Sequence, residues 1–342
     1  MGAVPGQYFF SRCIMVTIYD IARLSGVSKS TVSRVLNNHP YISTENRMKV
    51  EKVIEELNYV PNSIAKQFRQ KQTKCIGILV PDLNHPYFSQ LVSSISSECN
   101  RKGFKTVVHQ TFSSKKLERE VYTQLRNKEL DGIILTSSLL SEEEIAECTQ
   151  KNLLVACNED FSGNYFDVFC LNEENVTFEA TTYLLNKGLT KIGFCSDNID
   201  TPSQQARLRG FILAHDKKGL NHTKDYIFNQ ISTVENGITL GLRLFKNRLE
   251  IEGIIAGSDF VAAGLIKSAE IHDIKIPQDF SVIGFDNHPI SLATTPQVST
   301  ICNRIKDMSN DLVDHMANKI NGKKQIPVKK IYNGKIIIRE SN

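Results

Sequence analysis

A short segment near the N-terminus carries polar side chains at spacings that would place them together on one helix face. Apolar side chains share one face of this segment, and the opposite face carries Lys29, Ser30, Ser33, Arg34 and Asn37. The guanidinium fork of arginine matches the O6 and N7 acceptors of guanine, and lysine makes a similar contact as a point charge. The pattern therefore predicts a helix that reads base edges in the DNA major groove.

Two helices joined by a tight turn must position this face. Thr17 and Asp20 have the spacing of a capping box, which predicts that a first helix begins there. Gly26 is typical of a helix C-terminus, and Ser28 is a good N-cap for a second helix. Two short helices around a glycine-containing turn are an arrangement that the major groove admits. An unrelated helical hairpin is the alternative interpretation.

A third helix and a linker should follow. Apolar residues recur at helical spacing over residues 44–58, and Pro61 ends the pattern. Asn62 can cap a short hinge helix over residues 63–70, and the charged run over residues 69–74 is typical of a linker.

Length and charge suggest a basic DNA-binding part attached to a larger body. The 342 residues favour two or three domains. Residues 1–74 hold 11 Lys and Arg against 5 Asp and Glu, a net charge of +6, and the remainder holds 30 against 32, a net charge of −2. Such a distribution favours phosphate-backbone binding confined to one end of the chain.

Several other classes of protein lack support. No apolar run approaches the roughly 18–20 residues of a membrane helix, and Ser11 and Arg12 interrupt the only apolar stretch that resembles a secretory signal. We expect residues 1–15 to be a disordered extension, with Met15 as an alternative start. The eight cysteines form no C-x-x-C pair, which indicates buried free thiols in a cytoplasmic protein; disulfides or zinc are the alternative.

From residue 75 onward, strand-like apolar runs alternate with amphipathic segments, which favours parallel α/β architecture. The candidate strands are 76–80, 106–109, 132–135 and 153–156, then 192–195, 253–255 and 281–285. Similar sequence patterns recur in the two sets of strands, so we expect two lobes. Because ligands of open α/β sheets sit beyond the carboxyl ends of the strands, a ligand cleft between the lobes is expected.

The chain resembles the lactose/galactose repressor (LacI/GalR) family over roughly residues 16–340. In the headpiece, the matching residues are Thr17-Ile-Tyr-Asp-Ile-Ala22, Gly26-Val-Ser28 and Thr31-Val-Ser-Arg-Val-Leu-Asn37. In the body they include Pro86-Tyr-Phe88, Leu130-Asp-Gly-Ile-Ile134, Arg207-Leu-Arg-Gly-Phe211 and Ser281-Val-Ile-Gly-Phe-Asp286. The resemblance implies an all-α helix-turn-helix headpiece with a hinge helix. It also implies an α/β domain of two Rossmann-like lobes, as in periplasmic sugar-binding proteins.

The resemblance also implies domain limits. We expect a headpiece over 16–60, a hinge helix and linker over 61–73, and an effector-binding and dimerisation domain over 74–342. The first lobe would take 74–159 and 302–325, and the second 160–301 and 326–342. The chain would cross between the lobes near 158–161, 300–303 and 323–327.

By resemblance, Lys29 and Ser30 occupy positions that vary with operator sequence, and Arg34 occupies a base-reading position. The expected phosphate contacts, which fix register, are Thr17, Thr31, Ser33, Asn37 and Ser43. Simple solvation is the alternative for each.

The hinge departs from the family pattern. Relatives usually carry Ala-Arg-x-Leu, whereas this chain carries Ala65-Lys-Gln-Phe68 after Asn62. We expect Asn62, Ala65 and Phe68 to contact DNA, with Phe68 inserted between base steps in the minor groove. Packing of Phe68 against its own headpiece is the alternative.

The effector site implied by the resemblance consists of Tyr87, Phe88, Asn158, Arg207, Ser258, Asp286 and Asn303. Aromatic walls and paired polar side chains suit a sugar or sugar derivative. Ser258 stands where relatives often have Asn, so the ligand stays open, and Arg207 would equally suit a carboxylate or phosphate. A salt bridge without ligand contact is the alternative for Arg207 and Asp286.

The resulting hypothesis is a repressor that binds a pseudo-palindromic operator as a homodimer under control of a small molecule. A co-regulator protein is a further possible partner. No cofactor or enzymatic activity is expected, because no G-x-G-x-x-G follows the first predicted strand and no P-loop occurs. No metal is expected, because the histidines lack metal-ligand spacing. The rivals are a carbohydrate-binding protein without a regulatory DNA role and a nucleoid-type DNA binder without a ligand.

Overall fold

The computed structural model describes residues 16–59, 72–150, 153–220, 224–246, 250–323, 326 and 328–342. The chain divides into two compact units, Met1–Lys71 and Gln72–Asn342. The predicted extension over residues 1–15 and the hinge positions Asn62, Ala65 and Phe68 lie outside the described residues. None of the described helices is long and apolar enough to span a membrane.

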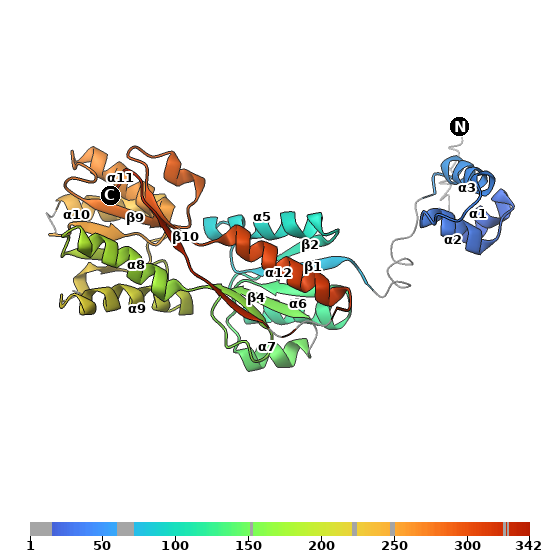
Figure 1. Cartoon of the computed structure of the whole chain (residues 1–342), viewed down its shortest axis with the longest axis horizontal. Coiled ribbons are helices and arrows are strands. Elements are labelled where there is room, and N and C mark those ends of the chain that lie inside the picture. Colours follow the sequence, from blue (N-terminus) through green and yellow to red (C-terminus); the bar gives the residue numbers. More distant parts are fainter. Residues whose placement is uncertain are drawn as a thin grey trace, which may run out of the picture. The chain divides into compact units, whose positions relative to one another are not determined.

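The described part of the first unit, residues 16–59, contains three helices, α1 (Ile18–Ser25), α2 (Lys29–Leu36) and α3 (Thr44–Glu56) (Figure 1). The predicted capping box is confirmed, since the Thr17 N–H donates to the Asp20 carboxylate over 3.0 Å and the Asp20 N–H donates back to Thr17 Oγ1 over 3.4 Å. Gly26 ends α1 with φ of 68°, a left-handed conformation that glycine adopts without steric cost. The three helices meet around the buried side chains of Ile21, Val32, Val35, Val50 and Val53.

The second unit is built on two sheets, each forming one lobe. The first sheet has the order β11-β5-β4-β3-β1-β2. Its strands are β1 (Cys75–Val80), β2 (Lys105–Gln110), β3 (Gly132–Leu135), β4 (Leu154–Asn158), β5 (Asp167–Leu171) and β11 (Lys329–Tyr332). The second has the order β12-β10-β9-β8-β6-β7. Its strands are β6 (Ile192–Cys195), β7 (Ile227–Phe228), β8 (Gly253–Ile255), β9 (Ser281–Phe285), β10 (Ser299–Cys302) and β12 (Lys335–Ile337). All neighbours pair in parallel except β12, which runs antiparallel to β10.

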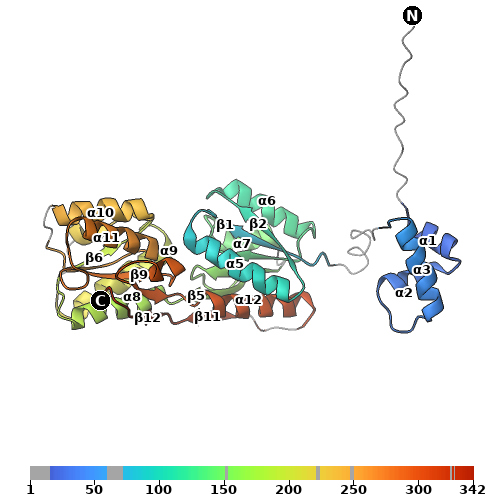
Figure 2. The ribbon, with the colours of Figure 1, turned by 90° about the horizontal axis from the view of Figure 1, so that it is seen from above.

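Helices flank both sheets, as Figures 1 and 2 show. Those of the first lobe are α5 (Pro86–Arg101), α6 (Lys115–Arg126), α7 (Glu142–Thr149) and α12 (Ile305–Ile320). Those of the second are α8 (Glu173–Asn186), α9 (Pro202–Lys217), α10 (Val234–Lys246) and α11 (Asp259–Ile271), with the short 3₁₀ turns Lys224–Tyr226 and Pro289–Leu292. The central strands are buried on both faces, which explains their continuous apolar runs. The predicted two-lobed α/β fold is confirmed.

The predicted lobe limits are wrong at two of the three crossings. Because β5 and β11 belong to the first sheet, residues 167–171 and 329–332 are part of the first lobe, not the second. The chain crosses after β5, between β10 and α12, and between β11 and β12, rather than near 158–161 and 323–327.

The chemistry of the two misassigned strands explains these errors. β5 begins with the charged residue Asp167, which is nevertheless buried because Lys319 pairs with its carboxylate and the Val328 N–H donates to it over 2.9 Å. β11 begins with two lysines and is exposed over its first three residues. An edge strand of this kind lacks the apolar run that identified the others.

Candidate DNA-binding and effector-binding sites

The polar face predicted for α2 is on the surface of the headpiece. Lys29, Ser30, Arg34 and Asn37 are exposed, and Thr31 and Ser33 are partly so. Val32 and Val35 on the opposite face are buried in the headpiece core. No described residue forms an ion pair with Arg34, so its guanidinium is available to an external partner.

Local contacts order the rest of this surface. Ser28 Oγ lies 2.7 Å from Ser30 Oγ and 2.9 Å from Thr31 Oγ1. The Asn37 amide donates to the Ser33 carbonyl over 2.7 Å. The Lys29 ammonium lies 3.8 Å from the ring centre of Tyr19, an exposed residue of α1 that the sequence analysis did not select. A cation over an aromatic face is held in place, so Tyr19 orients Lys29.

Thr17 and Ser43 lie at the N-termini of α1 and α3. Each hydroxyl accepts a backbone N–H over 3.4 Å, from Asp20 and Asn46 respectively. Helix N-termini present free N–H groups and a partial positive charge, so both positions suit a phosphate better than a base.

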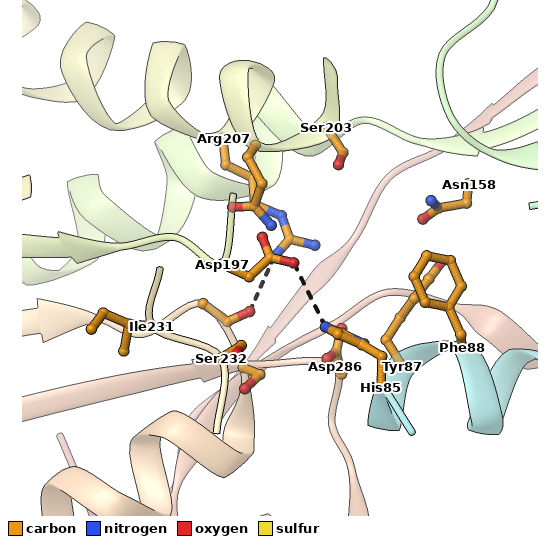
Figure 3. A pocket seen from close by; sticks show the side chains of 13 residues that line it. His85, Tyr87, Phe88, Asn158, Asp197, Ser203, Arg207, Ile231, Ser232 and Asp286 are labelled. Atoms are coloured by element: carbon orange, nitrogen blue, oxygen red, sulfur yellow. Dashed lines mark hydrogen bonds and ion pairs between the residues drawn. The ribbon is translucent and has the colours of Figure 1, made fainter. Parts of the chain in front are cut away.

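A cavity opens between the lobes of the second unit. The residues that line it are His85, Tyr87, Phe88, Asn158, Asp197, Ser203, Gln204, Arg207, Ile231, Ser232, Gly257, Ser258 and Asp286 (Figure 3). They come from the start of α5, the end of β4, the start of α9 and the segments after β6, β7, β8 and β9. Six of the seven predicted effector residues are among them.

The exception is Asn303, which does not line the cavity. Its amide instead donates to Asp286 Oδ1 over 3.0 Å. Asn303 therefore orients Asp286, and its contact with a ligand stays a prediction.

Arg207 is anchored in the cavity wall by several contacts. Its Nε and Nη2 donate to the two carboxylate oxygens of Glu173 over 2.8 and 3.4 Å, and Nη1 donates to the Gly257 carbonyl over 3.2 Å. The guanidinium lies 3.4 Å from the ring centre of Phe285. The side chain is almost fully buried. Arg207 therefore forms a salt bridge and also lines the cavity.

Asp286 follows β9 and has an unusual backbone, with φ of 96°. Burial raises the pKa of its carboxyl to about 6, although the charges of Arg207 and His85 oppose the rise. A left-handed conformation at a non-glycine residue is strained and is found at functional sites. Asn158 also has a positive φ, 80°, and its amide donates to the Thr136 carbonyl over 3.2 Å.

The aromatic residues and Ser258 complete the predicted set. The rings of Tyr87 and Phe88 meet edge to face with centres 5.3 Å apart, and burial raises the pKa of the Tyr87 phenol, which keeps it neutral. Ser258 Oγ accepts the Val261 N–H over 3.3 Å and thereby caps α11.

His85 and Asp197, which the sequence analysis did not select, link the two lobes. His85 precedes α5 of the first lobe and Asp197 follows β6 of the second, with Nε2 and Oδ2 3.7 Å apart (Figure 3). Burial would raise the pKa of Asp197, but hydrogen bonds from His85 and the Asn198 N–H, together with the charge of Arg207, outweigh burial and lower it. The sequence signal that could have identified them is their position, since Asp197 follows a predicted strand and His85 precedes a helix.

A basic helix-turn-helix unit followed by a two-lobed α/β body defines the class of DNA-binding transcriptional regulators. Residues 17–62 match the family described as bacterial regulatory proteins, lacI family, and residues 181–342 match the periplasmic binding protein-like domain. The chain is similar to the NTD biosynthesis operon regulator NtdR of Bacillus subtilis (strain 168), with 36% identity over 328 residues, 96% of this chain and 100% of that protein. The chain belongs to the lacI family of transcriptional regulators.

Solved structures agree with this fold. The Lac repressor dimer bound to operator and the anti-inducer ONPF matches with a TM-score of 0.83 and 22% identity, covering 95% of this chain and 98% of that one. A LacI family regulator from Lactobacillus casei with bound sucrose matches with a TM-score of 0.71 and 25% identity, covering 78% and 99%.

Proposed function

We propose that this protein is a repressor that binds a pseudo-palindromic operator as a homodimer and that a hydroxylated small molecule in the inter-lobe cavity controls this binding. The observation that carries the proposal is the cavity itself, because residues from both lobes line it. A ligand that contacts both lobes binds one arrangement of them better than another, and such differential affinity is what coupling requires. The protein acts by binding and not as an enzyme.

The headpiece supplies the contacts with DNA. Arg34, Lys29 and Ser30 contact base edges, because they are exposed on the outer face of α2. The phosphate contacts come from Thr17, Thr31, Ser33, Asn37 and Ser43, and the hinge contributes Asn62, Ala65 and Phe68. One headpiece reads few base pairs, so specificity requires two of them on a two-fold symmetric site.

Structures of similar proteins support a sugar as the ligand. One similar structure was solved with sucrose, and another similar one, also from Lactobacillus casei, with glucose. In the present chain, the aromatic pair Tyr87 and Phe88 suits the apolar face of a sugar ring. The polar residues around it suit hydroxyl groups.

Selection of bound DNA from a random pool tests the operator. The full-length protein should enrich an inverted repeat, and analytical ultracentrifugation at micromolar concentration should show a dimer. Enrichment of no sequence, or a monomer bound to a single half-site, would contradict the proposal. A screen of sugars by thermal shift tests the cavity, and a shift that survives Arg207→Ala would place the ligand elsewhere.

A further inference from the structure

Two residues that line the cavity each carry a buried polar atom without a hydrogen-bond partner among the described residues. Among the lining residues, Gln204 Oε1 and His85 Nδ1 are buried and have no hydrogen-bond partner in the described part of the chain. The Gln204 side chain is 7% exposed, and its carbonyl oxygen only accepts. His85 Nδ1 also accepts when Nε2, which faces Asp197, carries the proton. A bound ligand should therefore bring N–H or O–H groups.

Carboxylates outnumber cations around the cavity. Asp197 and Asp286 line it, and Glu173 lies behind the guanidinium of Arg207. Three carboxylates against one guanidinium give a formal charge of −2 with His85 neutral, and −1 with His85 protonated. In Figure 3 the Asp197 carboxylate lies between Arg207 and His85. An anionic ligand would meet repulsion here, whereas a cation would be attracted.

The guanidinium of Arg207 does not reverse this preference. Three of its N–H groups already donate, two to Glu173 and one to the Gly257 carbonyl, and its charge is matched by Glu173 at 2.8 Å. One hydrogen on each of Nη1 and Nη2 remains, and these suit the oxygen of a hydroxyl group. Arg207 therefore serves a neutral oxygen better than a phosphate or carboxylate.

The aromatic wall is compatible with a cation. The Tyr87 and Phe88 rings both line the cavity, and the face of an aromatic ring attracts an ammonium group. Carboxylates and aromatic faces both attract a protonated amine.

We propose that the cavity selects a hydroxylated ligand that carries a protonated amine, an amino sugar or amino polyol, with the ammonium group held by Asp197 and Asp286. Gln204 and His85 accept hydrogen bonds from other groups of the ligand. This inference rests on the proposed function, in which the cavity is the effector site. It narrows the ligand class from sugars in general to aminated ones.

The test compares probes of one shape and different charge on the full-length protein. Isothermal titration calorimetry measures the affinities of glucosamine, N-acetylglucosamine, glucose and glucose 6-phosphate, and the corresponding galactose compounds extend the panel. The protonated amine should bind at least tenfold more tightly than its N-acetyl counterpart, and the phosphate most weakly. Asp197→Asn should reduce the ratio of amine to N-acetyl affinity at least fivefold.

A matched control separates the site from general charge effects. Asp225→Asn changes an exposed aspartate of the second lobe that does not line the cavity, and it should leave the ratio unchanged. If Asp197→Asn lowers the unfolding temperature, Asp286→Asn, which neutralises the other carboxylate of the site, provides the same test.

The possible outcomes distinguish the preference for an amine from the proposed function of the cavity as an effector site. Neutral or anionic sugars that bind at least as tightly as the amines, or an unchanged ratio in both carboxylate variants, would overturn the amine preference and leave the proposed function standing. Failure of every probe to bind would overturn both.

Discussion

The Arg207 guanidinium and the Glu173 carboxylate form an ion pair between α9 and α8, with Nε and Oε2 2.8 Å apart and both side chains almost fully buried. A second pair, Arg209 with Glu174, joins the same two helices at the same 2.8 Å, but its side chains are 59% and 43% exposed. The two pairs share chemistry and distance and differ in burial. A comparison of the two pairs therefore measures the effect of burial on the energy of the ion pair.

The comparison predicts unequal losses of stability. Glu173→Ala leaves a buried guanidinium unpaired, which typically costs about 3–5 kcal/mol. Glu174→Ala removes an exposed partner and should cost about 0–1 kcal/mol. Chemical denaturation of both variants measures the difference, and equal losses would show that burial of the first pair has no energetic consequence.

Replacement of Arg34 should weaken specific DNA binding. Arg34→Ala removes a guanidinium that is exposed on α2 and is expected to contact a guanine, so about 1–3 kcal/mol of discrimination should be lost. Fluorescence anisotropy with the selected operator measures this loss. Arg126→Ala, an exposed arginine on α6 of the body, serves as the control. Equal affinities in the two variants would remove Arg34 from the reading surface.

The hinge prediction concerns Phe68, which lies outside the described residues. If Phe68 inserts into the minor groove as predicted, Phe68→Ala should weaken specific operator binding at least tenfold, while the unfolding temperature stays the same. Phe68→Leu, which restores a wedge of the family type, should recover most of the affinity. An alanine variant with wild-type affinity would rule out insertion.

The contribution of Asp259 to the stability of the second lobe should decrease as pH rises above about 4. Burial raises the pKa of Asp259 to about 8, although hydrogen bonds from Thr300 and the His288 N–H oppose the rise. A carboxyl whose pKa is higher in the folded state binds more protons when folded, so its contribution is complete below the unfolded pKa of about 3.9. The contribution is lost as pH rises through the folded value.

Asp259→Asn removes this titration. The free energy of unfolding of the variant should fall less steeply between pH 4 and pH 8, by at most about 1.4 kcal/mol per pH unit for one proton. Denaturation curves at several pH values measure the slope. Asp225→Asn should keep the wild-type slope, and a variant at Asp259 that also keeps it would contradict the assignment.

The headpiece was largely predictable because its signals are local. The capping box of Thr17 with Asp20, the left-handed Gly26 and the apolar face containing Val32 and Val35 depend on spacing within one or two turns. The strands 132–135, 192–195, 253–255 and 281–285 were also predicted with the observed bounds, since a strand buried on both faces is mostly apolar.

The parts that were missed depend on distant partners. The pairing of Asp167 with Lys319, 152 residues away, allows a charged residue to begin the buried strand β5. The pairing of His85 with Asp197 likewise depends on how the lobes meet. The hydrogen bond from Asn303 to Asp286 likewise joins residues that are distant in the sequence.

The most direct test of the central claim measures operator affinity with and without a ligand that binds the cavity. Wild-type protein and Arg209→Ala should both show coupling of about 1–3 kcal/mol, a change of roughly 5- to 150-fold in affinity. Arg207→Ala, and the double variant Arg207→Ala with Glu173→Ala, which leaves neither charge unpaired, should bind the operator normally and show no change on addition of ligand. A ligand response that persists in both variants, or is absent from the wild-type protein, would contradict control of DNA binding through this cavity.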